Sequence, residues 1–94
     1  MEHNNHLEIM LITQEECAEV TQAISKVFRF GIDATHNAHT NRARLTEEVG
    51  DLKCMIDLMC DQGIIDREEV NKAADAKLKK LKRWSTIFGI PENY

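Results

Sequence analysis

EECAEV at residues 15–20 and EEVGD at residues 47–51 are the two stretches that decide the fold of this chain. Each stretch contains two acidic residues three positions apart, which places both carboxylates within about 60° of each other on one helix face. Apolar residues at helical spacing accompany each pair, so each pair borders an apolar stripe instead of lying on the solvated face. The acids concerned are Glu16, Glu19, Glu48 and Asp51.

The first stretch belongs to a helix that we expect to begin at Thr13 and to stop at Gly31. Thr13 and Glu16 have the spacing of a capping box, in which each side chain accepts a hydrogen bond from a free backbone donor. A glycine such as Gly31 is typical of the position that follows a helix. The expected apolar stripe is Cys17, Val20, Ile24, Val27 and Phe28.

The second stretch belongs to a helix that begins near Thr40 or Asn41, runs to about Cys60 and is ended by Gly63. Its apolar stripe is Leu45, Val49, Leu52, Met55, Ile56 and Met59. Between the two helices, the residues from 31 to 39 are polar and show no periodicity, and we expect a loop there.

A third helix is expected from Asp66 to about Trp84. Asp66 and Glu69 form a second capping box, and Ile65 and Val70 have the spacing of a hydrophobic staple. The apolar stripe of this helix is Val70, Ala74, Leu78 and Leu81.

These elements predict an all-α fold, a helical bundle of about three main helices per chain. We expect a single domain over residues 1–94, with a core at 13–84, an N-terminal arm at 1–12 and a C-terminal tail at 85–94. Within the arm, residues 7–11 could be extended or form an earlier helical turn. A chain of 94 residues has a modest core, and only 5% of these residues are aromatic. Helices that cannot cover one another within a subunit often associate between subunits, so we expect a homodimer or a homotetramer.

The net charge of −4 argues against a protein that binds nucleic acid polymers, which would show an excess of positive charge. The N-terminal stretch has no basic region and its apolar run is too short for a membrane span. The three cysteines are an odd number, which fits reduced thiols inside a cell. We therefore expect a cytoplasmic protein without a membrane partner.

If the first two helices pack through their apolar stripes, their four acids converge beside one seam. Carboxylates gathered and desolvated in this way repel one another, and a hard divalent cation removes that conflict. The all-oxygen ligand set favours Mg²⁺, with Mn²⁺ as a second choice, over iron or zinc. No glutamate has a histidine three residues later, as a di-iron bundle would need. From geometry alone, the alternative that these acids form a solvated surface stays open.

The same two stretches resemble the E-x-x-E…E-x-x-D signature of the all-α nucleotide pyrophosphohydrolases, over roughly residues 13–84. That superfamily includes MazG, the dimeric dUTPases, the dCTP pyrophosphatases and phosphoribosyl-ATP pyrophosphohydrolase. The resemblance implies an enzyme that cleaves a (deoxy)nucleoside triphosphate to the monophosphate and pyrophosphate. It implies that Mg²⁺ is held by the motif acids, which are also the catalytic residues, and that the sites lie near a subunit interface.

Several basic or polar residues are candidates for binding the nucleotide. Lys77 falls inside the apolar stripe of the third helix, and the resemblance implies a phosphate-binding lysine there, although a lysine at the edge of a stripe can also reach solvent. Lys26 lies on the same helix side as Glu16 and Glu19. The full set of substrate-binding candidates is Lys77, Lys26, Arg29, Lys80 and Asn71.

Two other functions stay open at this point. The first is hydrolysis of phosphoribosyl-ATP, which belongs to the same superfamily. The second is a non-catalytic helical module that senses nucleotides or contacts a basic partner protein through its acidic edge.

Overall fold

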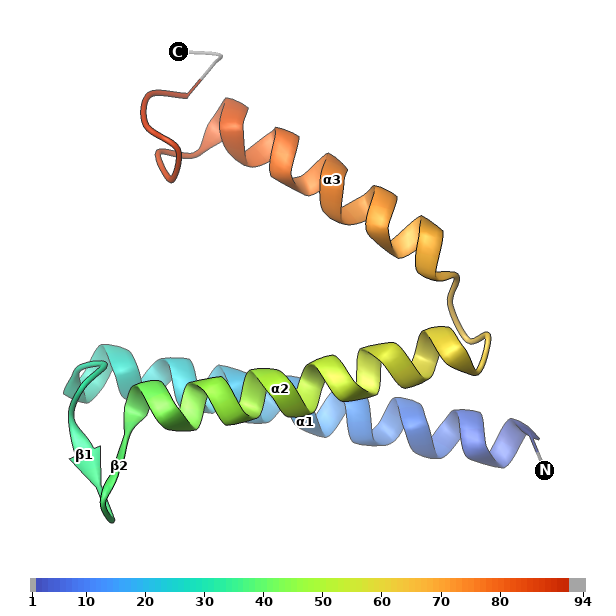
Figure 1. Cartoon of the computed structure of the whole chain (residues 1–94), viewed down its shortest axis with the longest axis horizontal. Coiled ribbons are helices and arrows are strands. Elements are labelled where there is room, and N and C mark those ends of the chain that lie inside the picture. The colour runs from blue at the N-terminus through green and yellow to red at the C-terminus, as the bar shows by residue number, and fades with distance from the viewer. Residues whose placement is uncertain (1, 92–94) are drawn as a thin grey trace. The chain divides into compact units, whose positions relative to one another are not determined.

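A computed structural model describes residues 2–91 of the chain, with side chains from residue 5 onward. Over this range the chain forms helices α1 (Glu2–Phe30), α2 (Asn41–Asp61) and α3 (Arg67–Trp84). Two short strands, β1 (Thr35–His36) and β2 (His39–Thr40), connect α1 to α2 (Figure 1). The predicted all-α fold with three main helices is confirmed. The chain divides into two compact units, one up to Ile64 and the other from Ile65 onward.

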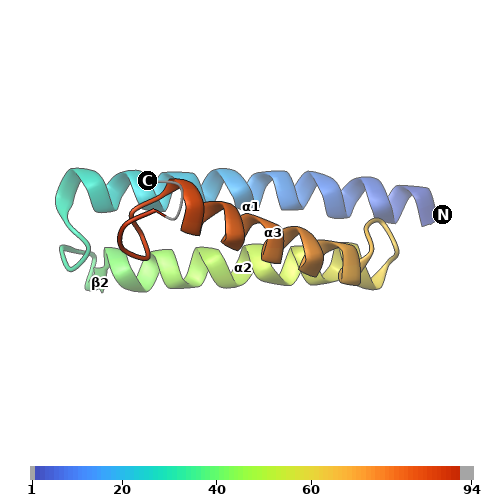
Figure 2. The same ribbon diagram turned by 90° about the horizontal axis from the view of Figure 1, so that it is seen from above.

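In the first unit, α1 and α2 lie side by side and antiparallel (Figures 1 and 2). Ala23 on α1 and Met55 on α2 are the buried hydrophobic residues of the described chain. Half-buried apolar side chains surround them on the facing sides of the two helices: Ile9, Ile12, Val20, Val27, Leu45, Leu52, Ile56 and Met59. The hydrophobic seam between these helices is therefore narrow, and it determines how the residues beside it are placed.

The predicted stripe of the first helix is only partly the face that packs. Val20 and Val27 are half-buried, but Cys17, Ile24 and Phe28 are exposed, with Phe28 84% accessible. The apolar face of α1 is wider than one neighbouring helix can cover, so α2 covers one side of it and leaves the other in solvent. On α2 the predicted stripe is more accurate, since only Val49 is exposed among its members.

The predicted start of the first helix is wrong. α1 begins at Glu2, and Thr13 lies inside it, where its hydroxyl donates to the carbonyl of Ile9 at 2.7 Å. Thr13 is therefore not a cap. Residues 2–12 are helical, which decides between the two alternatives left open for residues 7–11. No proline or glycine interrupts this stretch, and Ile9 and Ile12 extend the packed face toward the N-terminus. Residue 1 lies outside the described residues.

The connection between α1 and α2 contains a small antiparallel hairpin that the sequence analysis missed. Thr35 pairs with Thr40 and His36 with His39. The turn residues Asn37 and Ala38 have φ values of 52° and 67°. Asn-Ala is a weak turn signal compared with Asn-Gly, and strands this short have no alternating pattern to detect.

The start of α2 is confirmed and is held in two ways. The Thr40 hydroxyl accepts a hydrogen bond from the Ala43 amide at 3.0 Å, as an N-cap should. The buried Asn41 side chain donates to the carbonyls of Gly31 at 2.9 Å and Lys26 at 3.4 Å. Asn41 thus ties the end of α1 to the beginning of α2.

The second unit consists of α3 and the chain that follows it. The Asp66 carboxylate accepts from the Glu69 amide at 3.0 Å, which confirms the predicted cap. No side chain of α3 is buried, and Leu78 and Trp84 are among its exposed apolar residues. Among the described residues, no helix combines the length and the apolar character that crossing a membrane requires.

Asn41→Ala removes the side-chain donor that joins the ends of α1 and α2. The free energy of unfolding should fall by about 1–3 kcal/mol, because the buried Asn41 side chain loses its hydrogen bonds to the carbonyls of Gly31 and Lys26. Chemical denaturation followed by circular dichroism measures this change. Gln14→Ala, at an exposed position of α1, is the control and should have little effect; equal stabilities of the two variants would contradict this role of Asn41.

Candidate metal centre

The structure brings acids from both predicted pairs together at the α1–α2 seam. Glu16, Glu48 and Asp51 each offer a carboxylate oxygen, and these oxygens all lie within 4.8 Å of one another. Glu16 and Glu48 are half-buried on the facing sides of their helices, while Asp51 is exposed. The helical spacing of the apolar residues places the acids there, since each glutamate lies on the packed face of its helix.

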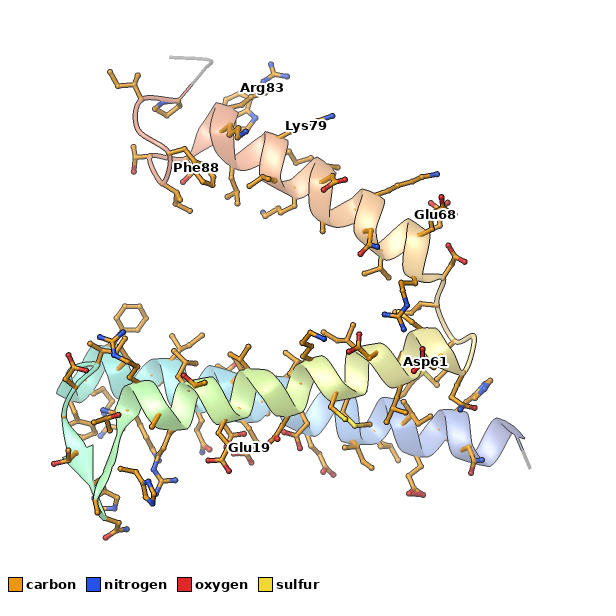
Figure 3. The ribbon with its side chains drawn as sticks, in the orientation of Figure 1. Glu19, Asp61, Glu68, Lys79, Arg83 and Phe88 are labelled. Atoms are coloured by element: carbon orange, nitrogen blue, oxygen red, sulfur yellow. The ribbon has the colours of Figure 1, made fainter. Side chains whose placement is uncertain are left out.

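Glu19 is the fourth predicted acid and lies outside this trio. Its side chain is exposed and projects from α1 into solvent (Figure 3). It still acts on the same site, because its charge contributes to raising the pKa values of both Glu16 and Glu48. All four acids therefore belong to one electrostatic cluster, which we call the acidic cluster.

The acidic cluster is electrostatically unfavourable as it stands. Desolvation raises the pKa of Glu16 above its usual range, and Asp51, Glu19 and Glu15 raise it further. Desolvation likewise raises the pKa of Glu48, and the surrounding acids add to that shift. No basic residue of the described chain forms an ion pair with any member of the cluster. Closely spaced carboxylate oxygens without a basic partner are the donor set that a hard divalent cation prefers.

Two cavities of the first unit share lining residues, and the smaller one borders the acidic cluster. The smaller one, of about 60 Å³, is lined by Glu19, Gln22, Ala23, Lys26, Asn41, Arg44 and Glu48. The larger one, of about 420 Å³, is lined by Lys26, Phe30, Ala34, Thr35, His36, Asn41 and Arg44. Glu19 and Glu48 belong to the cluster and to the smaller cavity, and three residues belong to both cavities. The cluster, the smaller cavity and the larger cavity therefore follow one another toward the hairpin.

The predicted substrate-binding residues divide into two groups. Lys26 lines both cavities, whereas Arg29 lines neither and instead places its guanidinium 4.9 Å from the centre of the Phe30 ring. The remaining three lie on α3 in the second unit, with exposed side chains: Asn71, Lys77 and Lys80. Their part in binding stays a prediction.

Most residues that line the cavities were not among the predicted site residues. Phe30 was missed because it faces a cavity shaped by the unpredicted hairpin. Asn41 was identified only as a helix start. Arg44 carried a usable signal, since it precedes Glu48 by one helical turn on the side of the helix that bears the acids.

Glu48→Gln should raise the melting temperature of the protein in EDTA, because it removes one charge from the repelling cluster. Adding Mg²⁺ should raise the melting temperature of the wild type more than that of the variant. Differential scanning calorimetry with and without Mg²⁺ measures both effects.

Glu47→Gln is the matched control, because it removes the same charge at the neighbouring exposed position. It should leave the response to Mg²⁺ unchanged. A lower melting temperature of Glu48→Gln in EDTA would contradict the repulsion within the cluster. Equal stabilisation of all three proteins by Mg²⁺ would show that the cluster does not hold a cation.

Comparison with known proteins places the chain in a family. The family model of the MazG nucleotide pyrophosphohydrolase domain matches residues 4–85, which is most of the chain. Searches among curated proteins and among solved structures gave no significant match. The matched range includes the acidic cluster, both cavities and all three helices except the first residues of α1. The chain belongs to the MazG nucleotide pyrophosphohydrolase family.

Proposed function

We propose that this chain is a Mg²⁺-dependent hydrolase that cleaves a (deoxy)nucleoside triphosphate to the monophosphate and pyrophosphate. The observation that carries the proposal is the approach of three carboxylates to within 4.8 Å, without a basic partner, in a chain of this family. Mn²⁺ has the same preference for oxygen ligands and should replace Mg²⁺.

The four acids have two roles in this proposal, binding of the cation and orientation of the attacking water. Glu16, Glu48 and Asp51 hold the cation, and Glu19 completes the ligand set from the exposed side. A bound divalent ion neutralises negative charge on phosphate oxygens and lowers the pKa of water beside it. Glu19 is also our choice for the group that orients the attacking water and accepts its proton, because its carboxylate is outside the tight trio and reaches solvent.

The nucleotide fits along the line from the acidic cluster to the hairpin. Its outer phosphates lie at the cluster, and Lys26, which has no ion pair within the described chain, supplies a positive charge at the wall shared by the cavities. The nucleoside occupies the larger cavity, whose volume of about 420 Å³ is in the range of small-molecule sites. Phe30 offers an aromatic ring there, and Thr35 and His36 offer polar groups. Arg29, Asn71, Lys77 and Lys80 are proposed as further contacts.

We propose that the chain functions as a homodimer or a homotetramer, because α1 and the second unit expose large apolar side chains. Only Ala23 and Met55 are buried hydrophobic residues within the described chain, whereas many large ones are exposed. A monomer rarely leaves so much apolar surface in solvent. The exposed residues are Leu7, Met10, Leu11, Ile24, Phe28, Phe30, Ile32, Val49, Leu78, Trp84, Ile87, Phe88 and Ile90.

The proposed activity is tested by measuring pyrophosphate release from a panel of ribo- and deoxyribonucleoside triphosphates and from phosphoribosyl-ATP. Release should require Mg²⁺ or Mn²⁺ and stop in EDTA. Glu19→Gln should lower kcat by about 10²–10⁴-fold if it accepts the proton of the water, and Glu15→Gln, at the exposed neighbouring position, should leave kcat unchanged.

The panel also separates the alternatives. Release from phosphoribosyl-ATP alone would assign the chain to that reaction instead. Stabilisation by Mg²⁺ and nucleotide without any product would indicate a nucleotide-sensing module. An absence of both release and stabilisation would overturn the proposed function.

Phe28→Glu tests the proposed assembly, because it places a charge at the most exposed apolar side chain of α1. Burying that charge between subunits is costly, so the variant should sediment as a smaller species than the wild type in analytical ultracentrifugation. Ser25→Glu on the same helix introduces the same charge at a polar position and is the control. A wild type that sediments as a monomer at all concentrations would contradict the assembly.

A further inference from the structure

Arg44 is the one side chain of the described residues with a buried polar atom that has no hydrogen-bond partner. The residue is half-buried, and its Nε is completely shielded from solvent. A buried donor on a charged group is unfavourable unless something accepts from it. The protein therefore leaves one guanidinium donor at this position without an acceptor.

No neighbouring acid among the described residues forms an ion pair with the Arg44 guanidinium. It lies one helical turn before Glu48, a spacing that allows ion pairs, yet no carboxylate of the described chain pairs with it. Arg42, two residues earlier, shows the contrast, because its guanidinium contacts the Asp33 carboxylate at 3.1 and 3.4 Å. Arg44 therefore does not serve to neutralise the acidic cluster.

Arg44 also adds positive charge near the start of α2. The N-terminus of a helix carries partial positive charge, which favours anions and disfavours cations. The first turn of α2 contains no acidic residue, and Arg44 follows directly after it. An unpaired arginine there makes the surroundings attractive to an anion that the chain itself does not supply.

The two cavities indicate where that anion would lie. Arg44, Lys26 and Asn41 line both cavities, so they mark the passage between the one that contains Glu48 and the one that contains Phe30. A nucleotide with its nucleoside in the larger cavity and its outer phosphates at the acids must place its first phosphate in this passage. Arginine suits such a position, because its planar guanidinium can donate two parallel hydrogen bonds to one phosphate.

We propose that Arg44 binds the phosphate esterified to the sugar, so that it holds this phosphate both in the substrate and in the monophosphate product. The proposal rests on the proposed function, because it takes the orientation of the nucleotide from it. It has a consequence that a general positive charge would not have: Arg44 should matter for nucleoside monophosphates and much less for pyrophosphate, which lies on the metal side of the passage.

The test is isothermal titration calorimetry on the full chain with Mg²⁺. The ligands are the deoxynucleoside 5′-monophosphates of adenine, guanine, cytosine, thymine and uracil, and separately pyrophosphate. Arg44→Gln should raise the Kd of the monophosphates that bind the wild type by about 10–100-fold, as loss of a charged hydrogen bond implies, and should leave the Kd of pyrophosphate nearly unchanged. Arg44→Lys, which keeps the charge without the planar fork, should give an intermediate Kd.

Arg42→Gln is the matched control, since it removes an exposed arginine two residues away that already has a partner. It should bind every ligand as the wild type does. Circular dichroism melts of each variant show that it is folded, and removal of a buried unsatisfied donor should not lower the stability of Arg44→Gln.

Three outcomes would overturn the proposal: unchanged monophosphate binding by Arg44→Gln, an equal loss of monophosphate and pyrophosphate binding, or no monophosphate binding by the wild type. These outcomes are distinct from failure of the proposed function. Pyrophosphate release by the wild type together with unchanged binding by Arg44→Gln would leave the function standing and remove the role of Arg44. If Arg44→Gln selectively loses monophosphate binding but the wild type shows no turnover, the role of Arg44 stands and the proposed function falls.

Discussion

Repulsion between carboxylates at the seam of α1 and α2 is the constraint on which this structure depends. Glu16 and Glu48 are drawn into partial burial because they lie on the faces through which the two helices pack. Asp51 and Glu19 add negative charge beside them. Folding therefore works against the ionised form of these acids, and no lysine or arginine of the described chain relieves the conflict by pairing with them. A divalent cation from solution would relieve this repulsion.

The same spacing between a glutamate and a buried apolar residue occurs on both α1 and α2. Ala23 follows Glu16 by seven residues, and Met55 follows Glu48 by seven residues; these two are the buried hydrophobic side chains of the described chain. Two helical turns separate each glutamate from its buried neighbour, so both members of each pair lie on the same face. Cys17 and Val49, each directly after a glutamate, are both exposed. Packing and acid placement thus follow from one repeated helical pattern.

That repetition explains how much the sequence could reveal. Helical period was enough to place Glu16, Glu48 and Asp51 at a common seam, and capping chemistry was enough to locate Asp66 at the start of α3. Thr13 was misread because a threonine three residues before a glutamate has the same spacing at a helix start and inside a helix. Arg44 and Phe30 were missed because their importance depends on a cavity, and a cavity arises from elements that are distant in the sequence. Local patterns carry no information about which part of a wide apolar face meets its partner, so the exposure of Phe28 was also unpredicted.

The central claim is that these acids share one divalent cation, and anomalous diffraction from crystals grown with Mn²⁺ tests it most directly. The account predicts an anomalous peak at the seam, about 2.1 Å from carboxylate oxygens of Glu16, Glu48 and Asp51. A map in which Mn²⁺ is bound elsewhere, or in which the carboxylates turn away from one another with no ion between them, would contradict it.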